Sequence, residues 1–404
     1  MHIHTSMPMD YPKSAQTPSW MNVPLKYTLI FLWLLLIFSQ FFYPGAGLTA
    51  QKQPVEIGVI VAQSGKAQDY GASAIRGAQL AVDEINEHGG VLGHRLQLAV
   101  FDNKSTALNA RQAATKAVYR RVVGVVGAVW STHSLAVAPV LQEHKIPMIS
   151  PGSTAPEVTQ TGHYIFRTCY TDDFQGKLMA DFAFKSTGYQ RAAVLTNISE
   201  TYSKILARYF SANFISNGGE VIFQGGYKGS ATDYRDILHP LTSLKPDVVF
   251  VPGYSQDSGL IIKQARMLGI DAVFMGGDAW ETAVADYAGT ALEGSFFSTF
   301  WHPNVPYPKN RAFMARFTSV YDKGKNSAYV PLAYDAVWLL ADAMRRSRSL
   351  EPQKIRDALA ATQDFQGTTG RYSFNAHGDP VNKGASILKF IDGRWVFYKA
   401  FEPQ

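Results

Sequence analysis

The chain has 404 residues, of which 46% are hydrophobic and 17% are charged, and its formal net charge is +6 at pH 7. This composition excludes a disordered chain, and the length is enough for two domains with full cores. The basic residues are scattered rather than gathered in a block, which argues against a nucleic-acid partner.

The first 50 residues are predicted to be a targeting segment rather than part of the fold. Lys26 precedes an almost uncharged run from Tyr27 to Tyr43, and small residues follow at 45–47 and 49–50. This order is typical of a secretory signal peptide, and a translation start at Met21 would give it an arm of ordinary length. The run is just long enough to span a membrane, so a retained anchor is the alternative. We expect the mature chain in the periplasm.

From residue 55 onward, short apolar runs alternate with stretches of helical periodicity. Strands are predicted at 55–62, 96–101, 122–128 and 146–149, and helices at 71–88, 106–121 and 132–144. Such repeated β-α units predict a parallel sheet with helices on both of its faces.

A second series of similar size begins near residue 173, which predicts a second lobe of related architecture. Its expected strands are 192–195, 220–223, 247–251 and 272–275, and its expected helices are 173–186, 203–217, 231–243 and 256–268. Two late helices are predicted at 332–344 and 352–361. Strands at 387–391 and 395–400 flank Asp392-Gly393, a strong hairpin signal. The fold class is therefore α/β.

Enzyme, cofactor and metal signatures are not evident. Cys169 is the only cysteine, so no internal disulfide can form, and its apolar surroundings predict a buried small hydrophobe. Gly65-Lys66 lacks the hydroxyl residue of a phosphate loop, and the glycines at 124 and 127 lie within a strand. No cofactor and no metal ion is expected.

Polar residues recur after the predicted strands, at the edge where open α/β sheets bind ligands. The positions are Ser131, Ser153 and Thr154 in the first series, and Tyr202, Tyr254 and Asp278 in the second. Each has an ordinary explanation when taken alone: Ser131 as a helix N-cap, Asp278 as a turn residue, and the tyrosines as packed surface aromatics. Several on the same kind of edge favour a binding site.

The segment from Ile146 to Glu157 carries the most information about that site. A small polar loop follows its apolar run, and residues 153–155 are expected to begin a helical turn with Pro156 near its first position. Hydroxyl and backbone N–H groups there suit a carboxylate. Asp278 on the other lobe suits an ammonium, and tyrosines supply apolar walls with a polar tip. Together these groups predict a site for a free amino acid.

The chain from about residue 55 to its end resembles the periplasmic leucine/isoleucine/valine-binding proteins that serve ABC transporters. The matching stretches lie at 57–98, at 150–157 (SPGSTAPE), at 166–176 (FRTCYTDDFQG), at 264–280 (QARMLGIDAVFMGGDAW) and at 365–379 (FQGTTGRYSFNAHGD). The resemblance implies two Rossmann-like lobes joined by three crossovers, which close on the ligand like a hinged trap. Lobe 1 would comprise 54–172 and 297–376, and lobe 2 would comprise 173–296 and 377–404.

The resemblance also implies a role for each candidate residue. Ser131 and Thr154 match positions that bind the ligand carboxylate, with backbone groups from Gly152 and Ser153, and Asp278 matches the residue that meets the ammonium. Tyr202 and Tyr254 match cleft tyrosines of the second lobe. Two further aromatic positions near the side-chain pocket are Tyr70 and Tyr329. Trp130 replaces a small residue common in the family, so it is expected to narrow the pocket or line it with an aromatic ring.

We therefore expect a monomeric solute-binding protein that delivers an amino acid, branched-chain, aliphatic or aromatic, to the membrane permease of an ABC transporter. A ligand-sensing receptor component is the second hypothesis. A binder of an amide, urea or aromatic acid is the third, although Asp278 would repel a simple acid. No enzymatic activity is expected.

Overall fold

The computed structural model describes residue 33 and residues 52–229, 231–321, 327–381 and 383–401. The run on which the signal-peptide and anchor predictions rest lies outside these ranges, apart from residue 33. Within the described ranges, no helix combines the length and the apolar character that a membrane span requires.

Lobe 1 is built on a five-stranded parallel sheet with the strand order β2-β1-β3-β4-β5. Its strands are β1 (Lys52–Val61), β2 (His94–Asp102), β3 (Gly124–Gly127), β4 (Met148–Ser150) and β5 (Ile165–Arg167). Its helices are α2 (Gln68–Glu87), α3 (Ala107–Arg120), α4 (Ser131–Glu143), α5 (Glu157–Gln160), α12 (Tyr329–Ser347) and α13 (Pro352–Ala360). α12 packs along α2, so a late part of the chain completes an early lobe.

Lobe 2 is built on a seven-stranded sheet with the order β14-β13-β10-β9-β8-β6-β7. Its strands are β6 (Arg191–Asn197), β7 (Glu220–Tyr227), β8 (Val248–Phe250), β9 (Val273–Gly276), β10 (Phe296–Thr299), β13 (Ala385–Ile391) and β14 (Arg394–Phe401). β13 and β14 form the predicted antiparallel hairpin at one edge, while β6 to β10 are parallel.

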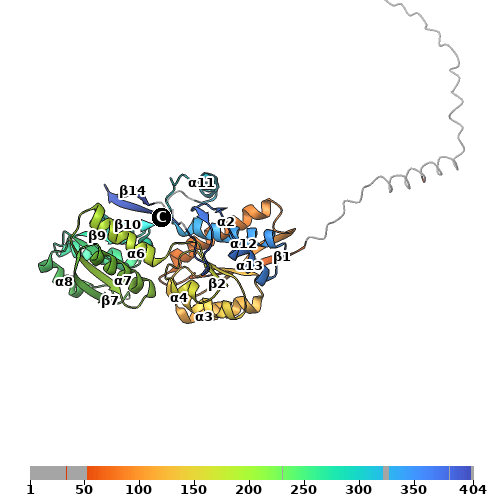
Figure 1. Ribbon diagram of the computed structural model, residues 1–404, viewed down its shortest axis with the longest axis horizontal. Coiled ribbons are helices and arrows are strands. Elements are labelled where there is room, and N and C mark those ends of the chain that lie inside the picture. The colour runs from red at the N-terminus through yellow and green to blue at the C-terminus, as the bar shows by residue number, and fades with distance from the viewer. Residues whose placement is uncertain (1–32, 34–51, 230, 322–326, 382, 402–404) are drawn as a thin grey trace, which may run out of the picture. The chain divides into compact units, whose positions relative to one another are not determined.

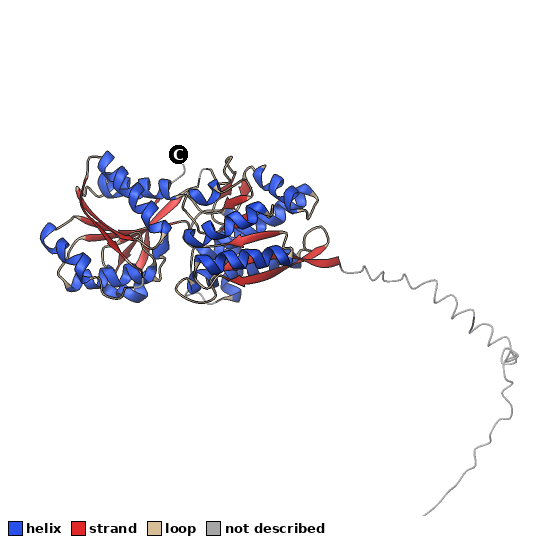
Figure 2. Ribbon diagram, turned by 90° about the horizontal axis from the view of Figure 1, so that it is seen from below, coloured by secondary structure: helices blue, strands red, loops and turns tan. Residues whose placement is uncertain are grey.

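The helices of lobe 2 are α6 (Asp172–Asp181), which continues as a short π-helix at Phe182–Ser186, and α7 (Thr201–Ser216), α8 (Arg235–Leu244), α9 (Ser255–Met267) and α10 (Val284–Ala288). Short 3-10 turns lie at Asp278–Trp280 and Gly289–Leu292. Figure 1 shows most of lobe 2 in green, with its late strand β14 in dark blue, and Figure 2 shows helices flanking the strands of each lobe. The predicted α/β class with two helix-flanked, parallel-rich sheets is confirmed.

The remaining elements lie on the return path of the chain. α11 (Pro308–Val320) packs against α12 through the rings of Phe313 and Tyr334, whose centroids are 5.1 Å apart. A two-stranded sheet pairs β11 (Phe365–Gln366) with β12 (Arg371–Tyr372).

The chain crosses between the two sheets three times: from β5 to α6, after β10, and before β13. The lobe boundaries at 172/173, 296/297 and 376/377 stay a prediction. The second boundary would cut through β10, because Thr299 still pairs with Ser386 of β13 in the lobe 2 sheet.

The apolar interior explains why these segments form these elements. The strands next to the centre of each sheet are almost wholly buried: Ile57, Val59, Val125 and Val126 in lobe 1, and Val248, Val249 and Phe250 in lobe 2. Strands buried on both faces read as continuous apolar runs, as the sequence does here. Parallel strands place all their carboxyl ends at one edge, which brings the residues that follow them together.

Candidate functional site

The predicted site residues converge on the facing edges of the two lobes, and all of them are buried. Lobe 1 contributes Tyr70 from α2, Trp130 and Ser131 from the β3–α4 junction, Gly152, Ser153 and Thr154 from the loop after β4, and Tyr329 from the start of α12. Lobe 2 contributes Tyr202 from α7, Tyr254 from the residue before α9, and Asp278 from the turn after β9.

The loop after β4 is held in shape by its own serines. Ser150 Oγ donates to the carbonyl of Ala128 at 2.7 Å and accepts from the N–H of Ser153 at 3.0 Å and of Gly152 at 3.4 Å. Ser153 Oγ donates to the carbonyl of Val129 at 2.9 Å. The N–H groups of Gly152 and Ser153 are thus already paired, and the ligand contacts expected from these two residues stay a prediction.

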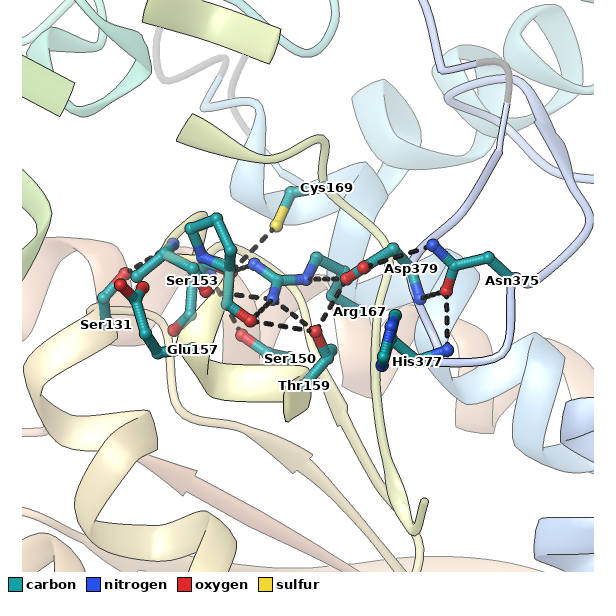
Figure 3. Close-up of polar contacts among 12 residues, drawn as sticks. Ser131, Ser150, Ser153, Glu157, Thr159, Arg167, Cys169, Asn375, His377 and Asp379 are labelled. Carbon is teal, nitrogen blue, oxygen red and sulfur yellow. Dashed lines mark hydrogen bonds and ion pairs between the residues drawn. The ribbon is translucent and has the colours of Figure 1, made fainter. Parts of the chain in front are cut away.

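Arg167, at the end of β5, organises the other side of this loop, as Figure 3 shows. Its guanidinium is fully buried and donates to the carbonyl oxygens of Ser153 at 2.5 Å and Ala155 at 2.9 Å. It also forms an ion pair with Asp379 at 2.7 Å. The planar guanidinium of Arg can donate to several oxygens at once in a fixed geometry, whereas the ammonium of Lys is a compact point charge.

The expected helical turn is present with Pro156 as its N-cap, but it begins later than expected, because residues 153–155 are irregular and α5 begins only at Glu157. The carbonyl of Ala155 joins the turn by accepting from the N–H of Val158 at 3.1 Å, in addition to Arg167. The carbonyl of Thr154 instead accepts from the N–H of Asp172 at 2.9 Å, so residues before Ala155 bond outside the helix.

Ser131 and Thr154 present hydroxyls next to each other in this framework. Ser131 is the first residue of α4, and its Oγ accepts from the N–H of Ala155 at 3.2 Å, so it bridges to the loop instead of capping its own helix. Thr154 is fully buried, and its Oγ1 has no hydrogen-bond partner among the described residues. A buried hydroxyl without a partner is costly, so it marks a place where a ligand atom would be accepted.

Asp278 offers a buried carboxylate from the opposite lobe. Its side chain is 1% exposed; Oδ2 accepts from the hydroxyl of Tyr329 at 2.9 Å, whereas Oδ1 has no partner within the described part of the chain. Burial raises the pKa of the Asp278 carboxyl from 3.8 to about 6, although the hydrogen bond from Tyr329 and the nearby polar groups of Gln175 and Tyr202 oppose the shift. The group is mostly ionised at neutral pH and can receive a cation.

Asp172, at the start of α6, is a second buried carboxylate that the sequence analysis missed. Neither of its oxygens has an aligned hydrogen bond from the described residues, although the nearby Thr154 hydroxyl lowers its pKa. Burial and the charge of Asp278 together raise the pKa of Asp172 well above its ordinary value. Both effects favour the protonated form of Asp172.

The five predicted aromatic residues form one cluster around Tyr70. Its ring centroid lies 5.6 Å from Trp130, 5.8 Å from Tyr254 and 5.5 Å from Tyr329. Trp130 and Tyr254 stack across the two lobes at 3.5 Å, and Tyr202 lies 5.6 Å from Tyr254. Trp130 therefore occupies the inter-lobe space with an aromatic ring, which agrees with its expected effect on the pocket.

The same junction is crossed by hydrogen bonds. The Tyr70 hydroxyl donates to the carbonyl of Ala279 at 2.7 Å and accepts from the N–H of Ser255 at 3.1 Å. Thr132 of lobe 1 donates to Glu200 of lobe 2 at 2.8 Å. In the described ranges, His, Cys, Asp and Glu side chains nowhere form a group of three or more that could hold a metal ion.

Comparison with known families gives one extended match. The family described as periplasmic binding protein matches residues 54–394. Its members are extracytoplasmic solute-binding proteins rather than enzymes.

Individual relatives cover most of the chain. The Leu/Ile/Val-binding protein BraC3 of Rhizobium johnstonii is 29% identical over 347 residues, which are 85% of this chain and 93% of the relative. A leucine-binding protein of Thermotoga maritima superimposes with a TM-score of 0.82 at 32% identity, covering 86% of this chain and 99% of that one. A branched-chain amino-acid substrate-binding protein of Streptococcus pneumoniae, solved with isoleucine, has a TM-score of 0.82 and 30% identity. The match covers 87% of this chain and 100% of that one.

Proposed function

Because the chain belongs to the periplasmic binding protein family, we propose that it captures a free amino acid outside the cytoplasm and delivers it to the permease of an ABC transporter. The names of its relatives support this proposal, since the Rhizobium johnstonii and Thermotoga maritima proteins are described as binding Leu/Ile/Val and leucine.

One observation carries the proposal: two buried polar atoms without hydrogen-bond partners face the junction from opposite lobes. They are Thr154 Oγ1 in lobe 1 and Asp278 Oδ1 in lobe 2, as far as the described residues go. A hydroxyl can donate to a carboxylate, and a carboxylate can accept from an ammonium. An α-amino acid carries both of the groups that these two atoms would bind.

The two lobes divide the work of binding. Ser131 and Thr154 of lobe 1 hold the α-carboxylate, at the N-terminal end of α4, where the helix dipole favours a negative charge. Closure then brings Asp278 to the α-ammonium and the rings of Tyr202 and Tyr254 to the side chain. In this scheme the lobe 1 groups bind first because they form a continuous, preformed surface, whereas the full clamp needs both lobes.

An amide, urea or aromatic acid remains the alternative ligand class. A simple acid would leave the Asp278 carboxylate buried and uncompensated, which disfavours it. The stack of Trp130 on Tyr254 is compatible with an aromatic amino acid as well as an aliphatic one. We further propose that the protein is a monomer without catalytic activity or a nucleic-acid partner, and that an N-terminal signal directs it to the periplasm.

The test is a thermal-shift screen of the chain from residue 51 onward against the amino acids, followed by calorimetry on each hit. A ligand at about 100 times its Kd should add about 2.7 kcal/mol to the stability of the folded state.

Two nearly isosteric variants, Asp278→Asn and Thr154→Val, should each weaken binding at least tenfold, since each removes one half of the clamp. Asp173→Asn is the matched control, because Asp173 directly follows Asp172 in the chain and its carboxylate is exposed. Amino-acid binding that survives unchanged in both clamp variants would refute the proposed site.

A further inference from the structure

A cavity of about 270 Å³ lies between the lobes, directly beside the aromatic cluster. The rings of Tyr70, Trp130 and Tyr254 form one of its walls, whereas Ser131, Thr154 and Asp278 do not line it. The cavity is therefore separate from the amino-acid clamp but shares the aromatic wall with it.

The rest of the cavity wall is strongly acidic. Five carboxyl groups line it against a single cationic side chain, Lys66: they belong to Asp69, Glu200, Asp257, Glu281 and Asp286. The Lys66 ammonium donates to the carbonyl of Gly229, so part of its hydrogen-bonding capacity is already used. The potential in the cavity is negative.

These carboxyl groups differ in how far they are already satisfied. Asp257 accepts hydrogen bonds from Tyr227 at 2.8 Å and Asn197 at 3.1 Å. Glu281 is buried against the N–H of Ala328, and burial raises its pKa to about 8, so it is largely neutral at pH 7. Glu200, half-buried, uses one oxygen for Thr132, and its other oxygen remains available to a ligand.

The Tyr254 hydroxyl gives a second, independent sign of a ligand. Tyr254 is 7% exposed and lines the cavity, yet its hydroxyl has no hydrogen-bond partner among the described residues. Its pKa lies well above the ordinary value, chiefly through burial and then through the charges of Glu200, Asp278 and Asp257. This hydroxyl can therefore accept a hydrogen bond from a donor group of a ligand.

We infer that the cavity receives a positively charged side-chain end, so that the solute is a basic α-amino acid with an apolar stem along the aromatic wall; this inference rests on the proposed amino-acid function. Tyr70, Trp130 and Tyr254 pack against the methylene stem, and Glu200 and the Tyr254 hydroxyl accept from the ammonium or guanidinium head. A branched aliphatic side chain would leave the acidic wall without a counter-ion.

Calorimetry with L-lysine, L-arginine, L-norleucine and L-leucine tests the inference. Norleucine is the matched probe, because it has the lysine stem without the terminal ammonium. Lysine or arginine should bind at least about tenfold more tightly than norleucine, and this ratio should shrink at high salt.

Glu200→Gln should reduce that ratio about tenfold, while it keeps an acceptor for Thr132. The control is Glu220→Gln, an exposed carboxylate at the start of β7 that does not line the cavity. Circular dichroism and the melting temperature confirm that each variant is folded.

The outcomes separate this inference from the proposed function. If leucine or norleucine binds as tightly as lysine, the inference that the solute has a basic side chain is overturned, and the proposal of amino-acid capture stands. A ratio that Glu200→Gln leaves unchanged overturns the assignment of the cavity. Binding of 1,5-diaminopentane without any amino acid contradicts the proposed function and supports a cation-binding cavity, whereas binding of none of these compounds refutes both.

Discussion

The Asp278 carboxylate is placed where it weakens the fold and serves the site. Burial raises its pKa from 3.8 to about 6, so the folded state holds its proton more tightly than the unfolded state does. Stability is therefore lost as the pH rises from about 4 through about 6, and the cost above this window is on the order of 3 kcal/mol.

Asp278→Asn should consequently stabilise the protein at pH 7, by about 1–3 kcal/mol, while it abolishes the clamp. The amide keeps an acceptor for Tyr329 and removes the buried charge. Urea unfolding at pH 7 and at pH 4 measures the effect. The difference between variant and wild type should be small at pH 4, where Asp278 is protonated in the folded state and about half protonated in the unfolded state. A variant less stable than the wild type at pH 7 contradicts the account.

Ligand affinity should also depend on the ionisation of Asp278, but it should rise with pH, whereas stability falls. An ammonium binds the ionised carboxylate, so affinity is highest above about pH 7 and falls about tenfold per unit below the Asp278 pKa of about 6. The pKa of the neighbouring Asp172 is raised well above its ordinary value by burial and by the charge of Asp278. Calorimetry between pH 5 and 8 checks the profile, and a flat curve would exclude Asp278 as the ammonium partner.

Six of the site residues were predicted because each follows a predicted strand, and strand ends share an edge: Ser131, Ser153, Thr154, Tyr202, Tyr254 and Asp278. The family resemblance alone suggested the other four, which are Tyr70, Trp130, Gly152 and Tyr329. Asp172 and Arg167 escaped prediction for a physical reason. Asp172 looks like an ordinary acidic residue in the first turn of a helix, and Arg167 ends a short strand of three residues. Only the tertiary structure shows that both side chains turn inward to the loop after β4.

At the scale of elements, that loop is fitted against α12. A Cβ at Gly152 would lie 2.4 Å from Cε1 of Tyr329 and 3.0 Å from Cγ1 of Val129. Tyr329 is buried and donates to Asp278, so the loop can reach its position only without a side chain at residue 152. The glycine thus links the carboxylate side of the clamp to its ammonium side.

Gly152→Ala should displace the Tyr329 ring, cost about 1–3 kcal/mol of stability and weaken ligand binding at least tenfold. Chemical unfolding and calorimetry measure the two effects. A double-mutant cycle provides the control, because in a Tyr329→Ala background the clash is absent and Gly152→Ala should add little. Additive losses would show that Tyr329 is not the affected neighbour.

The larger elements were predictable because their periodicity is strong. The longer helices of both lobes and the final hairpin lie within a few residues of their expected positions, as at Pro352–Ala360 and Ala385–Ile391. β5, β10, α11 and the five-residue α10 were not predicted. β5 and β10 have only three and four residues, too few for a clear pattern, and α11 starts after a Pro-containing loop and carries few buried positions.

At the scale of the whole folded unit, the lobes hold each other through contacts that also form the site. Tyr70 reaches from α2 to Ala279 and Ser255, and Tyr329 reaches from α12 to Asp278. The hinge side is fixed separately by Arg167, which joins the loop after β4 to Asp379 in the third crossover. Closure and ligand recognition therefore share residues, whereas the crossover contact does not depend on the cleft.

Tyr70→Phe should shift the equilibrium between open and closed lobes without disturbing either lobe. The ring contacts remain, but the carbonyl of Ala279 loses its donor, so affinity should fall by about 1–2 kcal/mol. Small-angle scattering across a ligand titration should show compaction of the variant only at higher ligand concentration. Tyr119→Phe, whose ring is 82% exposed, is the control and should compact like the wild type. Equal midpoints for Tyr70→Phe and wild type would contradict this role.

The single, buried Cys169 has a practical consequence. Burial raises the pKa of its thiol to about 12, and its Sγ donates to the carbonyl of Ser153 at 3.4 Å. A thiol that is neither accessible nor ionised does not react with maleimide dyes. One new cysteine on an exposed rim of the cleft would thus be labelled selectively, and lobe closure would then be reported as a change in fluorescence, which makes this scaffold suitable for a reagentless solute sensor.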